Sequence, residues 1–190
     1  MTVVYILLIV LQIGIIIFFI RRSKKQPAKK ASQLPNVYTA FRNQAIHVTP
    51  VQLKIAIPNT ESLVYGVVMD WDIGETLVTV AAYITGAASM YFRTGEGKVG
   101  GGKNPIVGEA AVDFVTTAQN FLDKATPVNT VEEPMRGMIR FYFLTNHRVY
   151  MAEEALAHYE TNDAKLFELF QKGNDVINQM HVGVNGSTPH

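Results

Sequence analysis

The sequence predicts an α+β protein, with a mainly antiparallel five-stranded sheet packed by two helices behind an N-terminal transmembrane helix. Three observations indicate this fold class. An uncharged apolar segment opens the chain, short β-rich segments follow with turns too short for crossover helices, and two later segments have helical periodicity. The expected element order after the anchor is strand-strand-strand-helix-strand-strand-helix.

The N-terminal segment has the length and polarity of a membrane anchor. Residues 3–20 carry no charge, and their eighteen positions span about 27 Å as a helix, close to a hydrocarbon core of ~30 Å. Positive charge follows this segment instead of preceding it, which is the reverse of a cleaved signal peptide. We therefore expect an uncleaved single-pass anchor at residues 1–20.

The cations after this anchor predict its orientation. Six Lys or Arg lie within residues 21–30, and the positive-inside rule then places the rest of the chain in the cytoplasm, at a plasma or inner membrane. These cations are also expected to contact anionic lipid headgroups. An inverted topology, with the domain outside the cytoplasm, is the alternative.

Composition divides the chain further and excludes some functions. Residues 21–36 are basic and contain two prolines, as expected of a linker, whereas 37–181 are expected to form a soluble domain and 182–190 a disordered tail. Of 17 Lys and Arg, six lie in the linker, leaving 11 against 16 Asp and Glu. This acidic balance argues against nucleic-acid binding. The absence of cysteine excludes disulfides and thiol catalysis.

Two further segments precede the predicted strands. Residues 37–41 fit either a short helix or a packed arm, and the alternating residues 51–57 fit a strand. Three β-rich runs with tight turns between them then predict a meander, and two more predict a hairpin around residues 145–147. These five expected strands are 63–71, 76–84, 89–93, 138–144 and 148–153.

Two amphipathic segments predict the helices. The first runs from Pro105 to about Ala125, with Asn104 as its N-cap and proline in its first turn. The second covers about residues 162–180 and has a weak point at Gly173. Between residues 63 and 180 this element order resembles the roadblock, longin and profilin-like group, and the resemblance implies a small sensor or adaptor domain.

The glycine-rich stretch TGEGKVGGGKNP, residues 94–105, resembles a phosphate-binding loop. It matches GxGxxG and also GxxxxGK, but Asn104 stands where a P-loop needs Ser or Thr for magnesium. An antiparallel meander before the loop argues against both nucleotide folds. A weaker hypothesis is an anion site ahead of a helix N-terminus, and the alternative is a flexible connection. The candidate anion-binding residues are Arg93, Gly97, Lys98, Gly100, Gly101, Gly102 and Lys103.

Two acidic positions are metal candidates. Asp70 and Asp72 are two apart on a predicted strand, so both face one side and could hold a divalent cation or share a proton, with Trp71 facing the core. Turn chemistry in the sequence DIGE also explains Asp72. Glu154 and His158 are four apart, without an evident third metal ligand.

No catalytic constellation emerges from these patterns. The sequence therefore favours a non-enzymatic, membrane-anchored cytoplasmic adaptor or scaffold that needs no cofactor and binds a protein partner or self-associates. Self-association could use the aromatic strand 138–144 if it lies at a sheet edge. The alternative is a ligand-sensing or enzymatic domain that binds a phosphate-bearing small molecule through residues 94–105.

Overall fold

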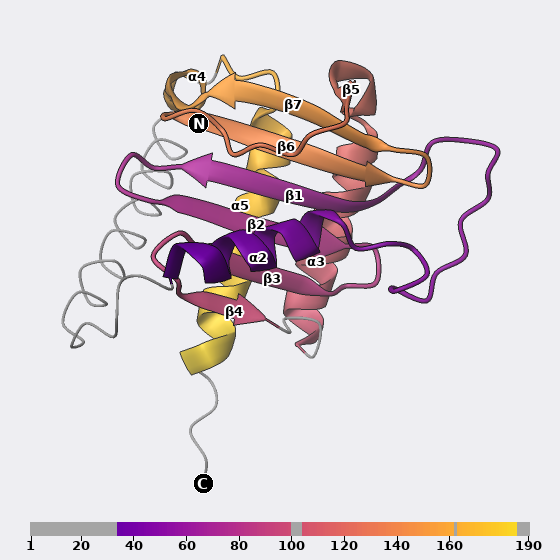
Figure 1. The fold of residues 1–190 in the computed structure, drawn as a ribbon, viewed down its shortest axis with the longest axis horizontal. Helices are drawn as coiled ribbons and strands as arrows, with labels where there is room; N and C mark the ends of the chain where they lie inside the picture. The colour runs from indigo at the N-terminus through magenta and orange to yellow at the C-terminus, as the bar shows by residue number, and fades with distance from the viewer. Residues whose placement is uncertain (1–33, 100–103, 162, 186–190) are drawn as a thin grey trace, which may run out of the picture.

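The computed structural model describes residues 34–99, 104–161 and 163–185 and shows an α+β fold built on one antiparallel sheet (Figure 1). The sheet order is β4-β3-β2-β1-β6-β7-β5, and every neighbouring pair is antiparallel. The strands are β1 Val64–Asp72, β2 Leu77–Tyr83, β3 Ala88–Phe92, β4 Gly97–Val99, β5 Thr126–Val128, β6 Met138–Thr145 and β7 Val149–Ala155.

The five predicted strands are present, but the predicted strand count was too low. Two strands of three residues each, β4 and β5, extend the sheet to seven at its two edges. Strands this short leave almost no alternating pattern in the sequence. Sequence reading therefore placed β4 within the glycine-rich loop and β5 in a connecting loop.

Helices cover both faces of the sheet. α3 (Pro105–Gln119) and α5 (Phe167–Asn185) pack on one face, and α2 (Leu34–Ile46) lies across the other (Figure 1). A short helix, α4 (Leu156–Glu160), follows β7 directly. Because helices cover both faces, every residue of β1 and β2 is buried, which explains their nearly continuous apolar sequences.

Two apolar clusters share the strands. On the α3–α5 face, Trp71 is buried with an edge-to-face contact to Phe170, which confirms the prediction that Trp71 belongs to the core. On the α2 face, aromatic residues of the sheet pack against Tyr38 and Ile46. The middle strands therefore belong to both clusters at once.

The helix predicted at Pro105 begins there and has the expected cap. Asn104 Oδ1 accepts a hydrogen bond from the backbone N–H of Ile106 at 3.0 Å, and Pro105 occupies the first turn. The helix is shorter than predicted. It ends at Gln119, and residues Leu122–Lys124 form a separate 3-10 turn.

The structure confirms one of the two predictions made for the segments before β1 and contradicts the other. The helical reading of residues 37–41 is confirmed, since they lie inside α2. The strand predicted at 51–57 is wrong, because this segment forms turns and irregular backbone. Its alternating Leu53, Ile55 and Ile57 each pack against the α2-face cluster. The alternation of apolar residues therefore reflects burial of these side chains, although the segment pairs with no strand of the described sheet.

The membrane assignment is corrected. No helix in the described ranges combines enough length and apolarity to cross a bilayer, and on this finding the expected single-pass plasma- or inner-membrane localisation is withdrawn. The apolar segment 3–20 and the basic residues 21–30 themselves lie outside the described residues. Two other predicted boundaries also shift. α2 begins at Leu34, inside the predicted linker 21–36, and α5 continues to Asn185, beyond the predicted helix end near residue 180.

The aromatic strand 138–144 does not form an edge. It belongs to β6, which lies between β1 and β7 and pairs with both. Edge-to-edge dimerisation through this strand is therefore wrong, because its backbone N–H and C=O groups are already used within the sheet. The edges of the described sheet are β4 and β5.

Candidate functional site

Asp70 lies at the centre of a buried polar network on the α2 face. Its Oδ2 accepts two bonds from the Arg42 guanidinium, from Nε at 2.9 Å and Nη2 at 2.6 Å. Its Oδ1 accepts the Thr79 hydroxyl at 2.5 Å. Complete burial raises the pKa of the Asp70 carboxyl, while Arg42 and Thr79 oppose that rise by stabilising the charged form.

The network continues into α2 through a second hydroxyl. Tyr38 Oη and Thr79 Oγ1 are 2.8 Å apart, and because Thr79 uses its proton on Asp70, Tyr38 must be the donor in this contact. Burial raises the pKa of the Tyr38 phenol well above its ordinary range, with the Asp70 charge adding to the effect. A chain of three side chains thus connects helix and sheet.

Arg42 also fixes the connector between β5 and β6, residues 129–137. Its Nη1 donates to the Val131 carbonyl at 2.7 Å, and its Nη2 to the Glu132 carbonyl at 2.9 Å. The same Glu132 carbonyl accepts Arg140 Nη1 at 2.9 Å and the Tyr142 hydroxyl. The network therefore attaches α2 and the connector to the sheet, and its polar groups are satisfied internally.

Asp72, the second candidate metal ligand, serves the turn after β1. Its Oδ1 accepts the backbone N–H of Gly74 at 2.8 Å and that of Gly137 at 3.2 Å. Asp70 and Asp72 share one side of β1 as expected, but each carboxylate is bonded to different groups. Among the described residues, no cluster of three His, Cys, Asp or Glu has an arrangement that could hold a metal.

The glycine-rich segment is only partly described. The Arg93 guanidinium forms an ion pair with Glu133 of the connector, and Gly97 begins β4. Lys98 pairs with Met90 through the backbone. Gly100, Gly101, Gly102 and Lys103 lie outside the described residues. The anion site stays a prediction, and within the described part Arg93 is bound to an acidic side chain of the protein itself.

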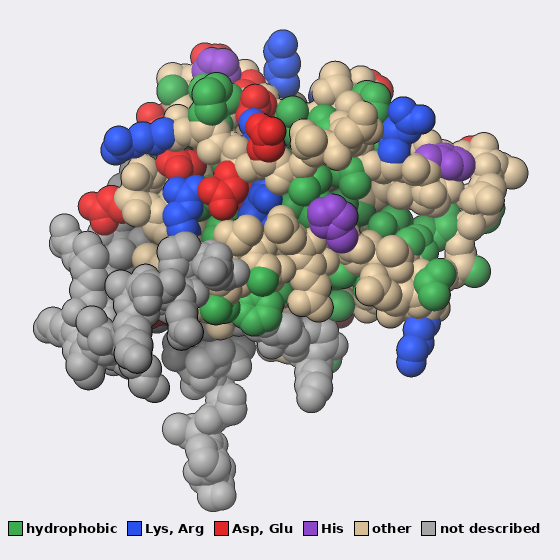
Figure 2. All heavy atoms as spheres, in the orientation of Figure 1, with side chains coloured by type: hydrophobic (Ala, Val, Ile, Leu, Met, Phe, Trp, Pro, Cys, Tyr) green, Lys and Arg blue, Asp and Glu red, His purple; other side chains and the backbone are tan. Residues whose placement is uncertain are grey.

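The surface on the α2 side is rich in charge. Figure 2 shows acidic and basic side chains lying together over β6 and β7. Two ion pairs on this side, Arg93–Glu133 and Arg140–Glu153, join groups of opposite sign. Much of this charge is therefore neutralised within the molecule.

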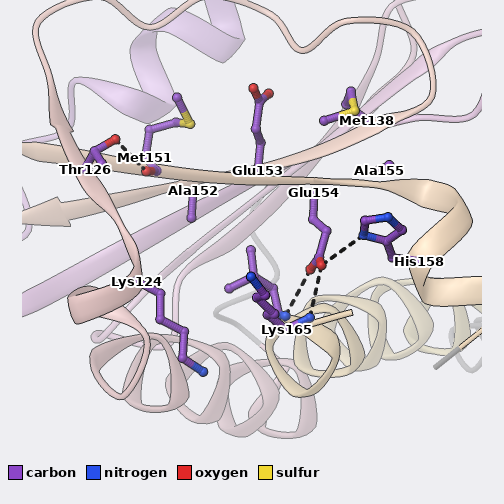
Figure 3. Close-up of a pocket in the computed structure, with 11 residues that line it drawn as sticks. Lys124, Thr126, Met138, Met151, Ala152, Glu153, Glu154, Ala155, His158 and Lys165 are labelled. Atoms are coloured by element: carbon purple, nitrogen blue, oxygen red, sulfur yellow. Dashed lines mark hydrogen bonds and ion pairs between the residues drawn. The ribbon is translucent and has the colours of Figure 1, made fainter. Parts of the chain in front are cut away.

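A hollow of about 750 Å³ lies along the outer edge of β7 (Figure 3). Side chains from both faces of the strand border it: Met151 and Glu153 project to one side of β7, and Ala152 and Glu154 to the other. Its lining comes from β6, β7, the 3-10 turn, β5, α4 and the segment before α5. The lining residues are Lys124, Thr126, Met138, Met151, Ala152, Glu153, Glu154, Ala155, His158, Lys165 and Leu166.

The short strand β5 creates this hollow. β5 pairs with β7 only opposite Val149–Met151, and before Thr126 the chain turns into the 3-10 turn Leu122–Lys124. Among the described strands, the last four residues of β7 therefore pair on the β6 side alone. Their outer backbone edge faces the hollow.

Both carboxylates at the hollow are already bonded. Glu154 Oε1 accepts the backbone N–H of Lys165 at 3.1 Å and lies 3.2 Å from His158 Nδ1, while Oε2 accepts the N–H of Leu166 at 3.2 Å. Glu154 and His158, which are four positions apart in the sequence, thus form a side-chain contact that joins β7 to α4. Glu153 pairs with Arg140, at 2.9 Å from Nε and 2.7 Å from Nη2.

The lysines at the hollow have no carboxylate partners in the described ranges. Lys124 Nζ lies 4.4 Å from the centroid of the Phe121 ring, a cation–π contact, and Lys165 forms no ion pair there. Glu153 is neutralised by Arg140, whereas Glu154 is bonded to neutral backbone N–H groups and to His158. Two lysines then face one carboxylate without a lysine or arginine partner, so the net charge at the hollow is positive.

Sequence reasoning missed this hollow. Its lining comes from six separate segments, which only the sheet order brings together. One local signal was available. Pro127 lacks a backbone N–H, so the residues around it can form only a short or edge strand.

Comparison of the chain with protein-family models, curated protein sequences and solved structures found no match. The function of the site is therefore inferred from the geometry and chemistry of this chain.

Proposed function

We propose that this protein is an adaptor or scaffold that binds a partner protein at the hollow along the outer edge of β7. The observation that supports this function is an exposed strand edge bordered by side chains from both faces of the sheet. An unpaired edge with adjoining apolar surface is a common site of protein association.

The lining has the mixed character of a protein interface. Met138 and Met151 supply partly exposed apolar surface, with the buried Ala152 and Leu166 behind it. Lys124 and Lys165, which have no carboxylate partner in the described ranges, also line the hollow. Apolar surface with a charged rim is typical of non-obligate interfaces. The buried Arg42–Asp70 network is completed inside the fold, which favours the hollow over that network as the functional surface.

Site-directed photo-crosslinking in the cells that naturally make this protein tests the proposal. A benzoylphenylalanine at position 155, inside the hollow, is compared with one at position 51. Val51 is 84% exposed and lies in the turn region before β1, so it is the matched exposed control.

The expected result is a discrete adduct from position 155 that position 51 does not give. An adduct with another protein supports the adaptor role, and an adduct between two copies supports self-association at the same surface. Identical patterns from the two positions, or no adduct from position 155, would contradict the proposal.

A further inference from the structure

We infer that the hollow binds an extended, acidic peptide segment of the partner, which adds to the sheet as a strand beside β7 where β5 ends. This inference rests on the proposed function and specifies the chemistry of the partner. Three observations carry it: the free backbone groups of β7, the position of the hollow around them, and the sign of the uncompensated charge.

The backbone direction of β7 follows from one hydrogen bond. Leu156 N–H donates to the Gly137 carbonyl at 2.8 Å, toward the β6 side. Since successive residues of a strand direct their backbone groups to opposite sides, Glu153 and Ala155 direct their N–H groups away from β6. No strand in the described ranges pairs with that side of these two residues, because β5 stops opposite Met151.

The hollow lies where an added strand would run. A neighbouring strand sits about 4.8 Å away in the sheet plane and presents alternate side chains to the two faces. The hollow is lined by Met151 and Glu153 on one face and by Ala152 and Glu154 on the other, so it flanks the plane of the sheet on both sides. A peptide bound there gains both backbone pairing and side-chain contacts.

The charge of the hollow and the length of the open β7 edge indicate which kind of peptide binds there. Lys124 and Lys165 have no carboxylate partner in the described ranges, and Arg140 neutralises Glu153. Glu154 keeps its charge but directs it to the backbone before α5, so the net charge is positive and an acidic side chain is complementary. The open edge covers only residues 152–155, between β5 and α4. A single short extended segment matches this gap in length.

The test measures the binding of labelled synthetic peptides to the full-length chain by fluorescence anisotropy. The probe is a short acetylated peptide of alternating threonine and valine with one central glutamate. A matched peptide carries lysine in place of that glutamate. Tighter binding of the glutamate peptide is expected, with the preference weakening as salt is added.

The backbone contact is tested with Ala155→Pro. Ala155 has φ −67° and ψ 136°, which proline adopts without strain, and it follows an extended residue. Proline removes the outward N–H, and the expected loss of affinity is about fivefold or more. Ala155→Ser keeps the N–H and is expected to bind as the parent does. Thermal melting of both variants checks that the fold is retained.

The charge contact is tested with the double variant Lys124→Glu, Lys165→Glu, which is expected to prefer the lysine peptide. Four results would overturn the inference: no peptide binding, with or without a dimer that Ala155→Pro dissociates; equal affinity of the two peptides; equal affinity of Ala155→Pro and Ala155→Ser; or a double variant that still prefers the glutamate peptide. If position 155 still gives its adduct in these cases, the adaptor role survives and the acidic-strand mode fails. If no adduct forms either, both fail.

Discussion

Asp70 and Arg42 show how a single residue pair determines where a helix and a connector lie. Asp70 is fully buried on β1, and Arg42 of α2 is 3% exposed. Burying two charges costs several kcal/mol, which their mutual hydrogen bonds offset only while both are present. The pair therefore specifies the position of α2 more than it adds to net stability.

Removal of either partner is expected to destabilise the fold. Arg42→Ala and Asp70→Ala should each lower the free energy of unfolding by about 3–5 kcal/mol, because each leaves a buried charge without its partner. Arg42→Met combined with Asp70→Leu should recover most of that loss. Urea unfolding of the three variants measures this, and a double variant as unstable as either single variant would contradict it.

Buried tyrosines predict sensitivity to alkaline pH. Burial raises the pKa of Tyr38, Tyr83 and Tyr159 above the ordinary value of about 10, so the unfolded chain loses these protons at a lower pH than the folded protein. Stability from these groups is fully present below about pH 10 and falls as the pH rises further. Tyrosinate absorbance should therefore develop together with unfolding.

A single variant isolates one of these groups. Tyr159 is fully buried and its hydroxyl forms no hydrogen bond to any residue that the structure describes, so Tyr159→Phe should fold normally. It should reduce the loss of unfolding free energy above pH 10 by about 1.4 kcal/mol per pH unit. An unchanged slope in urea unfolding at alkaline pH would show that Tyr159 ionises in the folded state.

At the scale of elements, Gly173 explains how closely α5 approaches the sheet. A Cβ atom at this position would lie 2.7 Å from Met69 Sδ on β1 and 3.2 Å from Phe114 Cζ on α3. The sequence marks this glycine as a weak point in the helix. In the fold it is the contact that lets α5 pack against β1 and α3 together.

Gly173→Ala is therefore expected to lower stability although alanine favours helix. Overpacking a filled core costs about 1–3 kcal/mol, and the gain in helix propensity is about 1 kcal/mol. Met69→Val should relieve the clash, giving a favourable coupling in a double-mutant cycle measured by urea unfolding. Higher stability of Gly173→Ala than of the parent would contradict this account.

At the scale of the whole molecule, the chain joins opposite edges of the sheet. After β4 at one edge it passes through α3 to β5 at the other edge, and it then returns through β6 to pair with β1 (Figure 1). The two apolar clusters lie on the two faces of the same strands. Neither cluster can separate without breaking strands that the other uses.

Unfolding is therefore expected to be a single cooperative transition. Trp71, the one tryptophan of the chain, reports on the α3–α5 face by fluorescence, and the near-ultraviolet tyrosine signal includes the α2 face. Both should coincide with far-ultraviolet circular dichroism in urea. Arg42→Ala should shift all three midpoints together. An earlier tyrosine transition would instead show that α2 separates from an intact sheet.

Elements that depend on neighbouring residues were predictable from the amino-acid sequence. The strand segments of β1, β2, β3, β6 and β7, the α+β class, and the start and cap of α3 follow from periodicity, turn residues and the Asn104–Pro105 pair. These patterns act over a few residues, so they can be read without knowledge of the fold. The short β4 and β5 and the membrane assignment mark where local reading failed.

Contacts between residues far apart in the chain became known from the folded structure. Asp70 was considered a metal ligand from its spacing to Asp72, but its partner is Arg42 of α2, 28 positions earlier in the chain. The hollow beside β7 depends on the sheet order and on where β5 ends. Strand pairing and helix placement depend on which side chains fill the shared cores of the complete chain, and no local pattern records that choice.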